Sequence, residues 1–194
     1  MFYEPKDGHG MAHNPFNAIV SPRPRGWIST TGSLGDNLAP YSFFNAVAYR
    51  PPQVMFASTG VKDSVRNIRE THVFAVNIVE EAMFAAMGET SATVPPDRDE
   101  FVLAGVAKGL CRTIACPCVA GAPAVLECVL VQEVTLRGTD NVMVIGEVTG
   151  VHLRDDCIVD GRFDVTRYRP VARLGYQDYA VVREVVTLAR PDER

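Results

Sequence analysis

A hydroxyl-rich turn with a lysine is the stretch of this sequence best suited to bind a ligand. The turn, STGVKDS over residues 58–64, follows an apolar segment and leads into residues with helical periodicity. Free backbone N–H groups at the start of a helix, together with the helix dipole, favour an anion at that position. The pattern therefore indicates a site for a phosphate monoester. The candidate phosphate-binding residues are Ser58, Thr59, Lys62 and Ser64.

The same turn also fits an ordinary capped helix, with Asp63 as the N-cap residue. The charge of Asp63 opposes a phosphate over the first turn unless Arg66 or Lys62 neutralises it. Lysine is scarce in this chain, because only Lys6, Lys62 and Lys108 stand among the 19 basic residues. That scarcity draws attention to Lys62, but both interpretations of the turn stay open.

Two polar residues, Ser42 and Asn45, lie in the otherwise largely apolar stretch 38–56. Burying a hydroxyl or an amide without a partner costs about 1–3 kcal/mol. The two positions differ by an odd number, so a regular strand would point them to opposite faces. A bulge could bring both to one ligand, for which a flat ring with polar groups along one edge would be suitable. Otherwise each side chain bonds the backbone of its own sheet.

The order of expected elements favours a mainly β fold with short helices. We expect strands at residues 26–31, 38–47, 53–58, 73–79, 124–134 and 142–153, helices at 63–71 and 80–87, and a loop at 88–100. Turn residues at 32–37 and 138–141 indicate two hairpins. A doubly wound parallel sheet needs a helix after nearly every strand, so we expect a closed or nearly closed antiparallel barrel.

Length and composition indicate one soluble globular domain over residues 1–194. The hydrophobic content is 47%, the charged content is 22%, and the net charge of −4 argues against non-specific nucleic-acid binding. We find no apolar leader and no run of about 18 apolar residues, and therefore expect a cytoplasmic protein with no membrane span. The five cysteines suit a reducing compartment. The role of Cys111, Cys116 and Cys118 stays open between free thiols and a redox or metal site.

Several stretches, in order along nearly the whole chain, carry a family resemblance. The specific ones are RPRGWIST at residues 23–30, NLAPYSFFNAVAYRPPQVMF at 37–56 and KDSVRNIRET at 62–71, and weaker motifs follow up to residue 175. With these motifs the sequence resembles the flavin-reductase-like family, which has the FMN-binding split-barrel fold. The resemblance implies a homodimer with one FMN per subunit near the subunit interface. It also implies that NADH or NADPH reduces the flavin, which can then serve a partner monooxygenase.

The resemblance also assigns roles to individual residues. Ser58, Thr59, Lys62 and Ser64 match the phosphate-binding turn, and Thr30, Ser42, Phe43 and Asn45 match the strands along the ring and ribityl chain. No catalytic side chain and no metal are required, because the flavin performs the hydride chemistry. A narrow barrel cannot bury all of Phe43, Phe44, Val47 and Tyr49, so these residues are expected to supply apolar surface for the second subunit.

Two departures from the family pattern bear on the substrate. Arg25 stands where an aliphatic residue is expected, and residues 111–118 (CRTIACPC) are rich in cysteine. Arg25 and Arg173 are candidates for holding the phosphates of the pyridine nucleotide, and the loop 88–100 could cover its nicotinamide. The alternative is that each is a plain surface feature.

Two other functions compete with a reductase. One is a non-enzymatic FMN electron carrier, which would barely consume NADH or NADPH. The other is an oxidase acting on a small amine or a phosphorylated vitamin, whose site needs more basic residues than Lys62 alone. The sequence does not distinguish NADH from NADPH.

Overall fold

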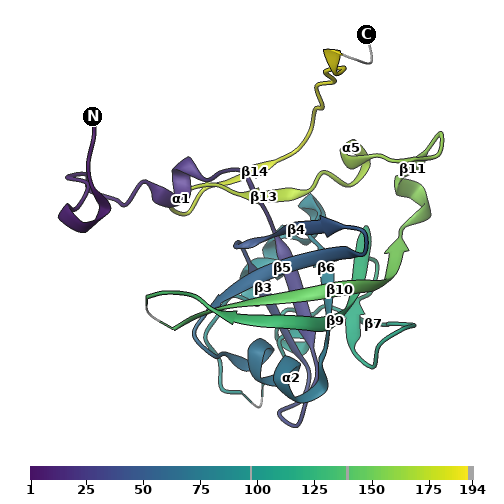
Figure 1. Cartoon of the computed structure of the whole chain (residues 1–194). Helices are drawn as coiled ribbons and strands as arrows, with labels where there is room; N and C mark the ends of the chain where they lie inside the picture. Colours follow the sequence, from purple (N-terminus) through teal and green to yellow (C-terminus); the bar gives the residue numbers. More distant parts are fainter. Residues whose placement is uncertain (97, 139, 192–194) are drawn as a thin grey trace.

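An antiparallel sheet that curls towards a barrel forms the body of the protein (Figure 1). The computed structural model describes residues 1–96, 98–138 and 140–191. Within this part of the chain, seven strands pair in the order β3-β2-β6-β9-β10-β5-β4, all of them antiparallel. They are β2 (Gly26–Thr30), β3 (Asn37–Tyr41), β4 (Phe44–Tyr49), β5 (Pro52–Thr59), β6 (Val73–Ile78), β9 (Ala124–Thr135) and β10 (Asn141–Leu153). The sheet comes close to closing, because β3 also contacts β5. The mainly β, antiparallel barrel class predicted from the sequence is confirmed.

Both predicted hairpins are present. β2 pairs with β3 from Gly26↔Tyr41 to Thr30↔Asn37, and β9 pairs with β10 along most of their length. Asp97 of the expected loop at 88–100 and Thr139 of the expected second turn lie outside the described residues, as do residues 192–194.

The predicted continuous strand over residues 38–47 is wrong, because the chain bends at Ser42-Phe43 and divides it into β3 and β4. The backbone carbonyl of Phe43 accepts a hydrogen bond from the Ala57 N–H at 2.8 Å, and β4 then pairs with β5 from Phe44 onward. Ser42 therefore lies in a bend, and the alternation of a regular strand does not relate it to Asn45.

Buried side chains form two layers on either side of the sheet. The barrel interior holds Ile28, Phe44, Phe56, Phe74 and Val144, among others. The outer layer includes Trp27, Met87, Phe101 and Val119. Glycine allows the closest approach inside the barrel, since a Cβ at Gly146 would lie 2.4 Å from the Phe74 ring. Phe44 is buried in this interior, which corrects its assignment to an exposed apolar surface.

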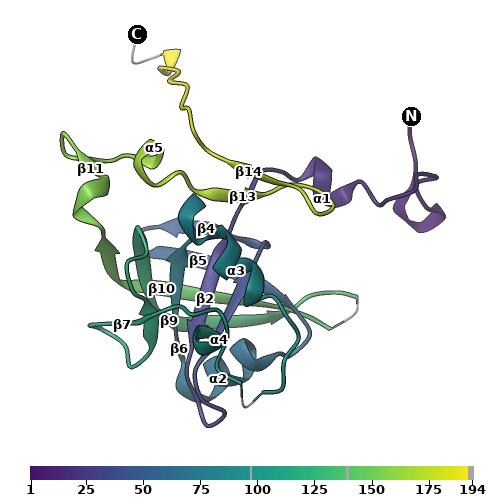
Figure 2. The same ribbon diagram turned by 180° about the vertical axis from the view of Figure 1, so that it is seen from behind.

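Short helices lie at one end of the barrel and on its outer face (Figure 2). α2 (Asp63–Thr71) has the predicted bounds, but its N-cap residue is Lys62, so the assignment of Asp63 as N-cap is wrong. The single helix expected at 80–87 is a 3-10 turn, η2 (Glu81–Met83), followed by α3 (Phe84–Glu89). α4 (Glu100–Leu103) ends the predicted loop and packs Phe101 into the outer layer.

Smaller sheets and turns complete the described chain. β1 (Arg23–Pro24), β13 (Val171–Arg173) and β14 (Tyr179–Val181) form one sheet, and β7 (Lys108–Leu110) pairs with β8 (Pro117–Val119). The remaining elements are η1 (Pro5–Asp7), α1 (Phe16–Ile19), η3 (Asp155–Cys157), β11 (Ile158–Val159), β12 (Arg162–Phe163) and α5 (Val165–Tyr168). Both terminal segments extend away from the barrel (Figures 1 and 2). No helix in the described part of the chain is long and apolar enough to cross a membrane.

Candidate functional site

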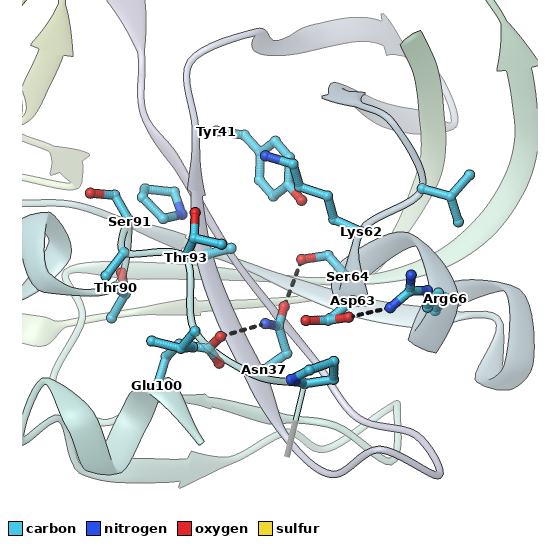
Figure 3. Close-up of a pocket in the computed structure, with 16 residues that line it drawn as sticks. Asn37, Tyr41, Lys62, Asp63, Ser64, Arg66, Thr90, Ser91, Thr93 and Glu100 are labelled. Atoms are coloured by element: carbon cyan, nitrogen blue, oxygen red, sulfur yellow. Dashed lines mark hydrogen bonds and ion pairs between the residues drawn. The ribbon is translucent and has the colours of Figure 1, made fainter. Parts of the chain in front are cut away.

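A cavity of about 350 Å³ opens at the start of α2, between that helix, strand β3 and the loop before α4 (Figure 3). Its wall combines small or apolar side chains with hydroxyl, amide and charged groups. The lining residues are Asn37, Ala39, Pro40, Tyr41, Val61, Lys62, Asp63, Ser64, Arg66, Thr90, Ser91, Ala92, Thr93, Val94, Pro96 and Glu100.

The first turn of α2 presents backbone donors to this cavity. Helical hydrogen bonding starts with the Arg66 N–H, which donates to the Lys62 carbonyl at 2.9 Å. No side chain in the described ranges caps the helix at Lys62, so the N–H groups of residues 63–65 lack a capping acceptor. The helix dipole adds partial positive charge at the same place, which favours an anion.

The charges around this turn leave Lys62 available. Arg66 Nη1 lies 2.8 Å from Asp63 Oδ1, so the acidic residue that opposed a phosphate has its own partner. Lys62 has no acidic partner within 4.0 Å among the described residues, and it lines the same cavity as Tyr41 (Figure 3). Within the described ranges, the turn thus combines an ammonium group that forms no ion pair with backbone donors that have no capping acceptor.

A buried hydrogen-bond chain forms the floor of the cavity. Ser64 Oγ donates to Asn37 Oδ1 at 2.6 Å, and Asn37 Nδ2 donates to Glu100 Oε1 at 3.0 Å. The Leu38 N–H donates to the other carboxylate oxygen of Glu100 at 3.1 Å. Burial raises the pKa of Glu100, and the hydrogen bonds from Leu38 and Asn37 oppose that change. These hydrogen bonds hold the start of α2, strand β3 and α4 in fixed positions.

Tyr41 supplies an aromatic side chain to the cavity wall. It is nearly buried, and its ring centroid lies 4.6 Å from that of Phe56 in the barrel interior. Burial raises the pKa of Tyr41, so the phenol stays protonated and remains a hydrogen-bond donor at neutral pH.

Comparison with known proteins identifies the family. Residues 20–172 match the family described as "Flavin reductase like domain". The chain belongs to this family.

Solved structures of similar proteins agree with this membership. Nitrilotriacetate monooxygenase component B from Bacillus cereus is 30% identical, with a TM-score of 0.90 over 97% of this chain and 98% of that one. The 2-nitrobenzoate 2-nitroreductase NbaA of Pseudomonas fluorescens is also 30% identical, with a TM-score of 0.82 over 90% and 88% of the two chains. A Shewanella frigidimarina protein with a split barrel domain is 23% identical, has a TM-score of 0.83 over 90% and 89%, and shows the fold. The resemblance and the split-barrel fold predicted from the sequence are confirmed.

Within this flavin-reductase-like domain, the predicted phosphate turn divides into two parts. Lys62 and Ser64 line the cavity, although the Ser64 hydroxyl is engaged by Asn37. Ser58 is buried and donates to the Gly60 carbonyl at 2.8 Å, and Thr59 is exposed. Neither Ser58 nor Thr59 is part of the cavity wall in this structure.

The residues predicted to lie along a ring are not at this cavity. Thr30 is fully buried and accepts a hydrogen bond from Asn67 Nδ2 at 3.2 Å. Ser42, Phe43 and Asn45 instead line a second cavity of about 640 Å³ beside β1 and β5, which shares no lining residue with the first. One chain alone therefore does not bring Ser42, Phe43 and Asn45 to the phosphate turn.

Arg25 and Arg173 lie around Tyr179 and line neither cavity, although Arg173 pairs across the strands with Arg23, which lines the second one. The Arg25 guanidinium carbon is 5.8 Å from the centre of the Tyr179 ring, and that of Arg173 is 4.5 Å from it. Arg25 Nε donates to the sulfur of Met87 at 3.4 Å. Burial lowers the pKa of Arg25, and the positive charges of Arg173 and Arg23 lower it further. Within the described ranges, no acidic side chain lies within 4.0 Å of Arg25 or Arg173.

Part of the cavity wall was not predicted from the sequence. Thr90, Ser91 and Thr93 line it from the loop that was predicted only as a cover, and Figure 3 shows them across the cavity from Lys62. The run TSAT at residues 90–93 is the sequence signal that could have found them. No sequence pattern marks Glu100, because its hydrogen bonds to Asn37 and Leu38 form only when α4 packs against β3.

The chemistry of the cavity fits a phosphate monoester joined to a flat, partly apolar group. Lys62 and the first turn of α2 supply positive charge and donors at one side. Pro40, Tyr41 and Val94 supply apolar or aromatic surface, and the hydroxyl groups of Ser91 and Thr93 lie beside it. This donor set suits FMN, the cofactor implied by the family resemblance.

Proposed function

We propose that this protein is an FMN-dependent flavin reductase that takes a hydride from NADH or NADPH. The observation that carries the proposal is Lys62, which has no acidic partner among the described residues, beside the uncapped first turn of α2 in a cavity of about 350 Å³. When bound there, FMN supplies the hydride chemistry, and the protein supplies position and electrostatics.

In this proposal the residues of the chain bind, orient and desolvate the cofactor. Lys62 and the backbone donors of residues 63–65 hold the phosphate, while Arg66 keeps the Asp63 carboxylate from repelling it. Tyr41 and Pro40 support the ring, and the loop that carries Ser91 and Thr93 limits access of water. The hydrogen-bond chain through Asn37 keeps these elements in place before the cofactor arrives.

We also propose that the arginine pair binds the pyridine nucleotide. Arg25 and Arg173 carry two positive charges near one tyrosine, and the described side chains place no carboxylate against them. Guanidinium groups suit the geometry of phosphate oxygens. The pyrophosphate of NADH or NADPH is the anion that the proposed reaction brings to the protein.

The proposal includes a second subunit and an acceptor of reduced flavin. Phe43, Val47 and Tyr49 are exposed on and beside β4 and offer apolar surface to a second copy of the chain. One similar structure is component B of a monooxygenase, a name that supports transfer of reduced flavin to a separate oxygenase. We place this reaction in the cytoplasm.

Anaerobic reduction tests the proposed activity. FMN-loaded protein is mixed with NADH or NADPH, and the loss of oxidised-flavin absorbance is followed against protein-free FMN. A reductase reduces many equivalents of added FMN with at least one of the two nucleotides. If neither nucleotide bleaches the bound flavin faster than free FMN, the protein is an electron carrier or an oxidase, and the proposal is wrong.

The acceptor can be examined in the same assay. NbaA, at 30% identity, is named as a 2-nitrobenzoate 2-nitroreductase, which favours a nitroaromatic acceptor as a second candidate. Addition of 2-nitrobenzoate to the reduced protein tests it. Consumption of the nitro compound in step with flavin reoxidation would support this second candidate, and an unchanged nitro absorbance would remove it.

A further inference from the structure

Three of the five cysteines gather at the end of the hairpin formed by β7 and β8. In this hairpin Gly109 pairs with Cys118 and Leu110 pairs with Pro117. Side chains alternate between faces along extended chain, so Cys111 and Cys118 belong to the face that carries Gly109. Cys116 and Cys118 are buried in the outer apolar layer, and the half-buried Cys111 packs against the same layer.

Cys111 and Cys118 are neighbours on this face of the hairpin. Interaction with Cys118, together with burial, raises the pKa of Cys111. The same interaction lowers the pKa of Cys118 to about 7 against the effect of burial, and the nearby His152 lowers it further. Gly109 leaves room beside the Cys118 sulfur, because a Cβ at that position would lie 2.9 Å from it. This arrangement places a nucleophilic sulfur next to a second thiol.

The neighbouring cysteines lack these properties. Cys116 lies 3.3 Å from the Ser29 carbonyl, to which its thiol donates, and burial raises its pKa to about 12. Cys128 is fully buried in the barrel interior, and burial raises its pKa as well. Only a thiolate attacks an oxidant efficiently, so the reactive sulfur of the group is Cys118.

The charged side chains around Cys118 are themselves held in place. The Glu127 carboxylate opposes thiolate formation, but it accepts hydrogen bonds from His152 and from the Thr113 hydroxyl. These groups connect the loop 112–116 to strands β9 and β10.

We infer that Cys111 and Cys118 are a redox-active dithiol that a small hydroperoxide converts into a reversible disulfide. The Cys118 thiolate attacks one peroxide oxygen, the O–O bond breaks, and Cys118 becomes a sulfenic acid while hydroxide leaves. The Cys111 sulfur then attacks the Cys118 sulfur, the S–O bond breaks, and water leaves. The two thiols lose two electrons in total, and hydrogen peroxide is reduced to two molecules of water.

Tryptic mapping of the oxidised protein tests this pair directly. Arg112 is the only trypsin site between Cys111 and Cys118, so cleavage leaves Cys111 in the peptide 109–112 and Cys118 in the peptide 113–137. After treatment of the intact protein with hydrogen peroxide and alkylation, we expect these two peptides to be cross-linked. Dithiothreitol should separate them and restore both free thiols. Oxidised protein in which peptide 109–112 is always recovered alone would overturn the inference.

Two variants identify the partner of Cys111, because the peptide 113–137 also contains Cys116 and Cys128. Cys116→Ser should keep the cross-link and Cys118→Ser should abolish it. The reverse result would show that Cys111 pairs with Cys116 and would overturn the assignment. In the wild-type protein the rate of cross-linking should rise as the pH increases through about 7, where the Cys118 thiolate forms. The rate is measured at the same peroxide concentration at each pH. A rate that does not change between about pH 6 and 8 would contradict the role of Cys118 as the attacking thiolate.

Discussion

Lys62 contributes its charge at the one place where α2 leaves backbone donors free, so its removal is the most direct test of the phosphate site. Lys62→Ala should weaken FMN binding by about 1.5–3 kcal/mol, the range for a hydrogen bond to a charged group. Riboflavin lacks the phosphate, so its affinity should be nearly unchanged. Calorimetric titration of both flavins measures the difference.

Lys6→Ala is the control, because Lys6 pairs with Glu4 far from the cavity and its loss should leave both affinities unchanged. Equal losses for FMN and riboflavin in Lys62→Ala would show that Lys62 has a structural role.

Glu127 makes a separate prediction about stability and pH. Burial raises its pKa, but hydrogen bonds from His152, from the Thr113 hydroxyl and from the backbone of Arg112 and Thr113 outweigh burial and lower it to about 2. A carboxyl whose pKa is lowered on folding stabilises the protein above its unfolded pKa of 4.5, and this stability is lost as the pH falls towards 2. The shift corresponds to a loss of roughly 3 kcal/mol across that interval.

Urea unfolding at a series of pH values from 5 to 2 measures this contribution. The variant Glu127→Gln has no charge to lose at this position. Its free energy of unfolding should therefore fall less steeply than that of the wild-type protein over the same pH series. Its stability at neutral pH should also be lower, because an amide is a poorer acceptor for the Arg112 and Thr113 N–H groups. Identical pH dependence in the two proteins would mean that Glu127 is not the ionised acceptor described here.

Individual residues differ in how far the sequence reveals them. Lys62 could be predicted because a rare lysine follows a hydroxyl-rich turn before a helix. Asn37 and Glu100 could not, because their hydrogen bond depends on packing α4 against β3 across 63 positions of sequence. The family resemblance assigns Thr30 to the strands along the flavin, but tertiary packing turns its hydroxyl towards Asn67 in the protein interior.

At the scale of elements, glycine positions determine how closely the strands pack on the barrel interior. Gly146 on β10 faces the Phe74 ring, and a Cβ there would lie 2.4 Å from the ring and 3.1 Å from the Cβ of Cys128. Gly146→Ala should therefore destabilise the protein by about 1–3 kcal/mol, as overpacking of a core does. Gly88 in α3 has open space around it, so Gly88→Ala should stabilise the protein by about 0.5–1 kcal/mol. Thermal unfolding of both variants compares the two, and a destabilised Gly88→Ala with a neutral Gly146→Ala would contradict this packing.

The sequence predicted elements well where periodicity was strong and poorly where a bend depended on tertiary contacts. The bounds of α2 were predicted because Val65 and Ile68 repeat with helical spacing between charged residues. The bend at Ser42-Phe43 was missed, because it is fixed by the hydrogen bond between Phe43 and Ala57 on another strand. β7 and β8 were also missed, since strands of three residues are too short to show alternation.

At the scale of the whole molecule, the separation of the two cavities bears on assembly. Ser42, Phe43 and Asn45 lie at a cavity distinct from the one that contains Lys62, and Phe43, Val47 and Tyr49 are exposed in the single chain. We predict a homodimer with twice the 21.2-kDa mass of the chain, whose dissociation is linked to loss of FMN. Light scattering over a dilution series with and without FMN measures this linkage. A monomer that keeps FMN at nanomolar protein concentration would show that the second subunit is not part of the site.

Direct titration of the purified protein with FMN is the measurement on which the central claim depends. Calorimetry, or quenching of flavin fluorescence, should show one FMN bound per chain at micromolar or lower concentration. Riboflavin should bind more weakly by the contribution of the phosphate, and added inorganic phosphate should compete with FMN more than with riboflavin. Absence of FMN binding at tens of micromolar would contradict the assignment of the cavity at the start of α2 as a flavin site.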